Sequence, residues 1–113
     1  MNLNFCRAEF DHVVVHARLR EESSSDQPNS ANVELFDAMD SLPEDQLREL
    51  VALYLYGCNH LFSDIESARN EAEKIGWEGI DLLHRGHELH VVLLNAVNRI
   101  EKIEPVIWQE GAG

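Results

Sequence analysis

Apolar residues recur at helical spacing along most of the chain, which predicts an all-α fold. The first helix should end near Arg20, and its apolar face follows the i, i+3, i+4, i+7 pattern. That face consists of Phe10, Val13, Val14 and Ala17. Three consecutive valines in this stretch would also suit a β-strand. We favour the helix because the apolar residues repeat with its period.

A polar stretch without apolar periodicity, residues 21–31, separates this helix from the next. Its serine, asparagine, aspartate and proline content is typical of a flexible surface linker. A short helix should follow the linker, with three apolar side chains facing inward: Val33, Phe36 and Met39.

The sequence Ser41-Leu42-Pro43-Glu44 has the pattern of a capping box. In that motif the serine hydroxyl binds a backbone N–H of the first turn, and the glutamate reaches back to the serine N–H. Proline fits there because the first turn needs no N–H donor. The predicted helix should end at Gly57, since glycine readily adopts the left-handed conformation of a C-terminal cap. Its apolar side consists of Leu47, Leu50, Val51, Tyr54 and Leu55.

A second capping-box pattern, Ser63-Asp64-Ile65-Glu66, predicts the start of another helix, which should end at Gly76. The inner face of this helix consists of Ile65, Ala68, Ala72 and Ile75. Its small alanines predict the close approach of a neighbouring helix. One or two further helical turns are expected from Trp77 to Leu83, before Gly86.

The last predicted helix runs from about His87 to Ile103 and ends before Pro105. Its apolar stripe is continuous and consists of Leu89, Val92, Leu93, Ala96, Val97, Ile100 and Ile103. An apolar segment, Val106-Ile107-Trp108, follows it, and residues 109–113 should form a loose tail. Together these elements predict a single domain over residues 1–113, with four to five helices in a compact bundle.

Composition limits the partners and the compartment. The chain has 9 lysines and arginines against 21 aspartates and glutamates, a formal net charge of −12. We expect such an acidic protein to bind neither nucleic acid nor an anionic membrane directly, because both repel it. No apolar run approaches the roughly 20 residues that span a bilayer. With no secretory signal and only two cysteines, the chain is predicted to be a reduced, cytoplasmic protein.

The central helix resembles that of a family of short bacterial proteins classified only as a domain of unknown function. The shared pattern reads LP..Q..ELVAL...G, from Leu42 and Pro43 to Gly57. Weaker similarity covers Val14, Ala17 and Arg18 before it, and Leu82, Leu83, Gly86, Leu89 and Leu93 after it. The chain departs from the family pattern at residues 58–60, where a short charged turn is expected. The resemblance implies an all-helical fold and a bacterial cytoplasmic location, and it implies no activity.

Three of the six histidines are spaced three residues apart: His84, His87 and His90. Neutral imidazoles at such spacing can chelate zinc or nickel, and Cys58 or His60 would complete a four-ligand shell. The competing interpretation is that these imidazoles are solvated side chains at helix ends.

The sequence contains few other candidates for metal ligands or catalytic residues. His12 and His16 have the i, i+4 spacing of two ligands, but no third ligand is evident. The serines at 23–25 lie in the predicted linker, where catalytic positioning is hard to hold. No glycine-rich phosphate loop is present. We therefore expect no enzymatic activity and no cofactor.

Two sets of residues are candidates for contact with a partner. Acids near the N-terminus of a helix are stabilised by its dipole, but a charge of −12 exceeds what capping needs. Apolar groups beyond the last helix indicate association if they are exposed, whereas they could equally fold back over the core. The expected contacts are the acidic Asp37, Asp40, Asp45 and Glu49 and the tail residues Ile107 and Trp108.

These features predict a non-catalytic adaptor, regulator or inhibitor that binds another protein with a basic or apolar surface, or a second copy of itself as a homodimer. One alternative is an acidic mimic of nucleic acid, of the kind made by phages and mobile elements, that blocks a DNA- or RNA-handling complex. A further alternative is a metal-responsive domain built on the histidine cluster.

Overall fold

Six helices form in the part of the chain that the computed structural model describes. That part comprises residues 2–3, 6–22, 28–58, 62–85 and 88–109, without the side chains of 28–32, 77, 84 and 85. The helices are α1 (Arg7–Glu22), α2 (Pro28–Asp40), α3 (Glu44–Cys58), α4 (Ile65–Ile75), α5 (Trp77–Arg85) and α6 (Leu89–Glu101). The all-α prediction is confirmed, with more helices than the four to five expected. None of these helices is long and apolar enough to cross a membrane.

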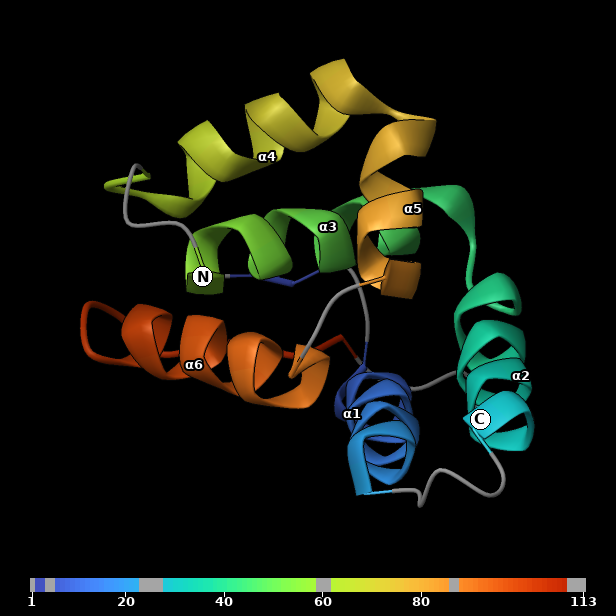
Figure 1. Ribbon diagram of the computed structural model, residues 1–113. Helices are drawn as coiled ribbons and strands as arrows, with labels where there is room; N and C mark the ends of the chain where they lie inside the picture. Colours follow the sequence, from blue (N-terminus) through green and yellow to red (C-terminus); the bar gives the residue numbers. More distant parts are fainter. Residues whose placement is uncertain (1, 4–5, 23–27, 59–61, 86–87, 110–113) are drawn as a thin grey trace.

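Helix α3 lies between α4 and α6, and the three form roughly parallel rows (Figure 1). Helix α5 packs on α3 as well, while α1 packs on α6 and carries α2 on its other side. This arrangement follows from α3 itself, because a helix that is apolar around most of its circumference must be covered by several neighbours. Its buried apolar side chains are Leu47, Leu50, Val51, Ala52, Leu53 and Tyr56.

The predicted end of α3 at Gly57 is wrong. The helix continues to Cys58, and Gly76 is the glycine with a positive φ among the described residues. A Cβ added at Gly57 would stand 2.2 Å from the carbonyl oxygen of Val92 on α6. The absent side chain therefore allows α3 and α6 to approach each other. The cap prediction was wrong because a glycine needed for space and a glycine needed for backbone conformation look alike in a sequence.

The first capping box is not formed among the described residues. The Ser41 hydroxyl donates to the carbonyl oxygen of Ala38 at 2.9 Å, so this serine closes α2 instead of opening α3. The carbonyl of Pro43 accepts from the N–H of Leu47, at 3.0 Å, in the turn that begins α3. Proline at this place supplies a fixed φ for the turn.

The predicted start of the helix after Ser63 is confirmed as α4, but its N-cap is one residue later than expected. Asp64, and not Ser63, is the N-cap of α4, and its Oδ1 accepts from the Ser67 N–H at 2.8 Å. This hydrogen bond favours the ionised carboxylate and lowers the pKa of Asp64. Gly76 ends α4 as predicted, with φ 53°.

Two side chains expected inside lie outside. Val33 is 55% exposed, and Leu35 and Met39 fill the inner face of α2 instead. Ile103 is 74% exposed because α6 ends at Glu101, before the predicted stripe is complete.

The ends of the linker and of the tail differ from the prediction. Within residues 21–31, expected to be a linker, 21–22 belong to α1 and 28–31 belong to α2, while 23–27 lie outside the described residues. Of the predicted loose tail, only Gln109 is described.

The segments before α1 and after α6 meet beside the core. Leu3 is fully buried, and its N–H donates to the carbonyl of Ile107 at 3.1 Å. The ring of Trp108 lies 5.2 Å from that of Phe10, and the Arg7 guanidinium lies 5.8 Å from the Trp108 ring. The tail therefore folds back over the core, one of the two alternatives, while the side chain of Ile107 remains exposed.

The close approach at Gly57 generates a prediction. Gly57→Ala places a methyl group against the α6 backbone, which cannot rotate away, so we expect a loss of about 1–3 kcal/mol in the free energy of unfolding. In an open helix interior the same change would stabilise by up to about 1 kcal/mol. Urea denaturation of both proteins measures the difference.

Gly79→Ala is the matched control. Its Cβ would meet side-chain atoms of Val51 and Ile75 at 2.7 Å and 3.1 Å, and these can shift more easily than a backbone carbonyl. We expect a smaller loss there. Unchanged or increased stability of Gly57→Ala would contradict the packing role of Gly57.

Candidate functional site

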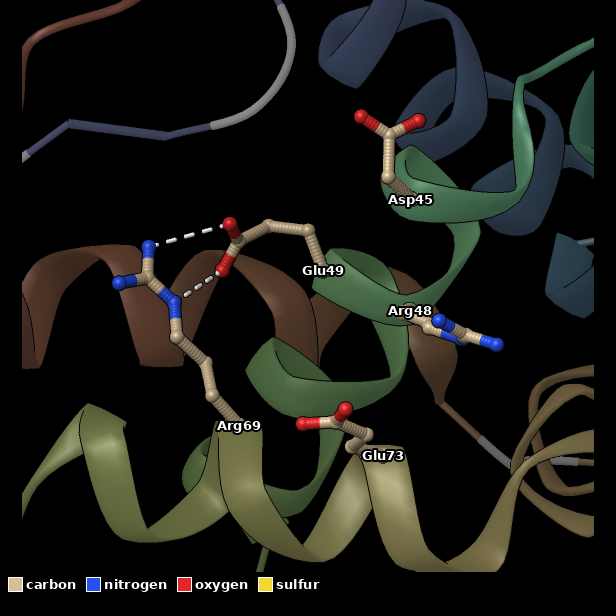
Figure 2. Close-up of a pocket in the computed structure, with 5 residues that line it drawn as sticks. All are labelled: Asp45, Arg48, Glu49, Arg69 and Glu73. Carbon is tan, nitrogen blue, oxygen red and sulfur yellow. Dashed lines mark hydrogen bonds and ion pairs between the residues drawn. The ribbon is translucent and has the colours of Figure 1, made fainter.

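A cavity of about 250 Å³ opens between α3 and α4, and charged side chains line it (Figure 2). The lining residues are Asp45, Arg48 and Glu49 from α3 and Arg69 and Glu73 from α4. They meet because residues three or four apart share one helix face. The cavity therefore brings together the facing polar edges of two helices whose other faces are buried.

The centre of this site is an ion pair between Glu49 and Arg69. The Arg69 Nε donates to Glu49 Oε1 at 2.8 Å and Nη2 donates to Oε2 at 3.0 Å, which is a two-point contact (Figure 2). Glu49 is only 3% exposed and is the buried charged residue of the described core. Such bidentate pairs are the strong form of the carboxylate–guanidinium contact.

Arg69 uses its remaining donors as well. Its Nη1 donates to Glu66 Oε1 at 2.8 Å, and its Nη2 also donates to the carbonyl of Asn2 at 3.0 Å. Partial burial alone would lower the pKa of Arg69, but the bonds and charges of Glu49 and Glu66 outweigh it and raise the pKa. Arg69 thus joins α3, α4 and the segment before α1, and its charge is neutralised within the fold.

The rest of the cavity carries an excess of negative charge. Arg48 is paired with Glu44 at 2.6 Å along α3. The exposed carboxylates of Asp45 and Glu73 have no hydrogen bond or ion pair within the described part of the chain. Within the described side chains, the arrangement therefore offers no free cation for an anionic ligand.

The structure separates the four acids that we expected to meet a partner. Asp37, Asp40 and Asp45 are exposed at the junction of α2 and α3, and we call these three the acidic junction. Glu49 does not share that exposed surface, because it is buried against Arg69. The sequence contained a signal for the burial of Glu49 against Arg69. Glu49 borders the buried run 50–53, and Arg69 follows Ala68 on the inner face of α4.

Two members of the acidic junction oppose the dipole of their own helix. Asp37 and Asp40 occupy the last turn of α2, which contains no basic residue. A negative charge is unfavourable there, because the C-terminal end of a helix carries partial negative charge. Neither carboxylate has a partner among the described residues. These two acids therefore give α2 no stability, whereas Asp45 lies in the favourable first turn of α3.

The histidine hypothesis stays a prediction. His87 and His60 lie outside the described residues, and the side chain of His84 is not described. The Nδ1 of His90 is buried and has no hydrogen-bond partner among the described residues. Within the described side chains, no three histidines, cysteines or acids lie close enough together to hold a metal ion.

The described thiols do not form an activated nucleophile. Burial raises the pKa of the Cys58 thiol, which keeps the thiol in its protonated form. Cys6 is buried, and its Sγ–H donates to Glu9 Oε1 at 3.2 Å.

Comparison with known proteins adds no assignment. No model of a known protein family matches the chain, and no curated protein or solved structure matches it. The resemblance of the central helix to a bacterial family therefore remains a prediction.

The buried ion pair generates a stability prediction. Arg69→Met leaves the Glu49 carboxylate buried without compensation, so we expect a loss of about 3 kcal/mol in the free energy of unfolding. This lies at the low end for such changes because Arg69 is 28% exposed. The double variant Glu49→Leu with Arg69→Met should recover most of the loss, since it buries no charge.

Arg48→Met is the control for the ion pair, because it removes an arginine from the same cavity whose partner Glu44 is exposed. We expect a change of less than about 1 kcal/mol. Urea denaturation at neutral pH compares the four proteins. A loss in Arg48→Met as large as in Arg69→Met would contradict the central role of the buried pair.

Neutralising the acids at the two ends of the junction should change the free energy of unfolding in opposite directions. Asp37→Asn and Asp40→Asn should each raise the free energy of unfolding by about 0.3–1 kcal/mol at low ionic strength, and Asp45→Asn should lower it by a similar amount. Thermal unfolding of wild type and the three variants at low and high salt measures these changes. The differences should shrink at high salt, and the same sign at all three positions would contradict the argument.

Proposed function

We propose that this protein is a small non-catalytic adaptor, regulator or inhibitor of a bacterial cytoplasm, and that its acidic junction binds a basic surface of another protein. The observation that carries the proposal is the position of Asp37 and Asp40. They are exposed, lack partners among the described residues and lie where the helix dipole disfavours them. Charges that weaken their own helix are retained more readily when they serve recognition than when they serve the fold.

The other charges of the described chain support this proposal. Several arginines are paired with acids one turn away, as in Arg7 with Asp11, Arg18 with Glu22 and Arg48 with Glu44. The acidic junction lacks such pairs and adjoins the negatively charged cavity that contains Asp45 and Glu73. Unpaired charge of one sign steers an oppositely charged partner, and it acts mainly on the rate of association.

Salt-sensitive capture tests the proposal. Tagged wild-type protein, Asp37→Asn/Asp40→Asn and the control Glu78→Gln, which removes an exposed acid from α5, are incubated with bacterial lysate at low and high salt. Bound proteins are identified by mass spectrometry. We expect a basic protein that wild type and Glu78→Gln retain at low salt, that high salt releases, and that the double variant fails to retain.

The outcome also separates the alternatives. If the retained protein handles DNA or RNA, and added nucleic acid displaces it, the protein acts as a mimic of nucleic acid. Retention that is unchanged by salt and by the double variant would overturn the role of the acidic junction and indicate an apolar interface. Candidates for that interface are the exposed Val91, Leu94, Ile103 and Ile107.

A further inference from the structure

Helix α2 is held to the rest of the protein mainly through α1. Helices α4, α5 and α6 pack around α3, whereas α2 packs on α1 at the edge of the molecule (Figure 1). Because α2 carries Asp37 and Asp40, the contact between α1 and α2 sets where these two acids lie. Any group that strengthens or weakens this contact therefore acts on the acidic junction.

Two histidines and a glutamate meet at that contact. The rings of His12 and His16, one turn apart on α1, lie 4.5 Å apart between centroids and are nearly perpendicular, at 82°. The Oε2 of Glu34 on α2 lies 3.9 Å from Nδ1 of His16. That nitrogen is buried and has no hydrogen-bond partner among the described residues. The contact thus contains a polar atom that is left unsatisfied and a carboxylate just beyond hydrogen-bond reach.

The arrangement changes when His16 gains a proton. A neutral imidazole interacts only weakly with a carboxylate at this distance, whereas an imidazolium forms an ion pair with it. Glu34 is exposed and free to rotate by the small amount that a hydrogen bond needs. Histidine is the side chain whose charge ordinarily changes between pH 5 and 8.

We propose that the contact between α1 and α2 is a pH-sensitive clasp, in which protonation of His16 draws Glu34 onto Nδ1 and holds α2 more tightly on α1. The added stability is present at low pH and is lost as the pH rises, because the folded contact favours the protonated imidazole. The consequence for partner binding rests on the function proposed above, whereas the clasp itself does not.

Helix α1 packs on α2 and on α6, and all three elements carry titratable or charged side chains. They include His12 and Arg20 on α1, Glu34 and Asp37 on α2, Glu88 at the N-cap of α6 and His90 in its first turn. Arg20 lies near Glu21 and Tyr54, and the backbone N–H of Glu88 donates to Glu21. Glu34 is the carboxylate within ion-pair distance of His16.

Hydrogen exchange of the full chain tests the clasp without any partner. The opening equilibrium of backbone amides 33–40 in α2 is measured at pH 5.5 and 7.5, corrected for intrinsic exchange, and divided by that of amides 66–75 in α4. In wild type we expect α2 to open about threefold less at pH 5.5, the effect of a modest ion pair. Glu34→Gln, at an exposed position, and His16→Asn should abolish this difference, and His12→Asn should retain it.

Each other result overturns the proposal. An opening of α2 that does not depend on pH in wild type would show that no clasp forms. The same pH dependence in Glu34→Gln as in wild type would show that another group is responsible, and loss of the dependence in His12→Asn alone would assign it to His12. Because no partner enters the measurement, these failures are distinct from a failure of the capture experiment.

Discussion

Helix α3 is buried around most of its circumference, and this burial dictates how the other helices pack. A helix with apolar residues on several sides is stable only when neighbouring helices cover each of those sides. Helices α4, α5 and α6 provide that cover. Close packing requires small residues at the contacts, which explains Gly57 against the α6 backbone and Gly79 against the side chains of Val51 and Ile75. The same close packing makes these positions sensitive to a single added methyl group.

The same constraint explains the buried ion pair. Glu49 lies on α3 between residues that are covered, so its carboxylate is removed from water together with them. An uncompensated charge there would be costly, and the Arg69 guanidinium meets both carboxylate oxygens. A buried pair of this kind seldom stabilises a fold more than apolar residues would, but it does specify how the two helices align. Through the Asn2 carbonyl, Arg69 extends this alignment to the start of the chain.

The features that point to function lie outside this core. The paired charges of the cavity serve the packing of α3 on α4, so the cavity is more a structural device than a ligand site. Asp37 and Asp40, which have no partner among the described residues, lie at the junction of α2 and α3 instead, and α2 depends on α1 for its position. The protein therefore combines a core of three helices packed around α3 with a helix pair, α1 and α2, that presents charge at its edge.

Local patterns in the sequence were enough to predict where the helices lie and most of their inner faces. A helix period, a proline or an N-cap acts over a few neighbouring residues, which is why α1 and α6 agree with their apolar stripes and Gly76 ends α4. Local pattern also identified Asp37, Asp40 and Asp45 as exposed acids. It did not distinguish Gly57 as a packing glycine from a helix cap, because the two differ only in what lies opposite.

Which helix covers which could not be predicted from local patterns, because it depends on how the whole chain packs. Glu49 and Arg69 are twenty residues apart in the chain, and no local sequence pattern predicts that they pair with each other. The contact between His16 and Glu34 was not predicted either, because Glu34 comes from α2 whereas both histidines lie on α1. Such pairings arise when the chain buries its apolar faces as a whole, and the charged groups then pair with whatever the packing places beside them.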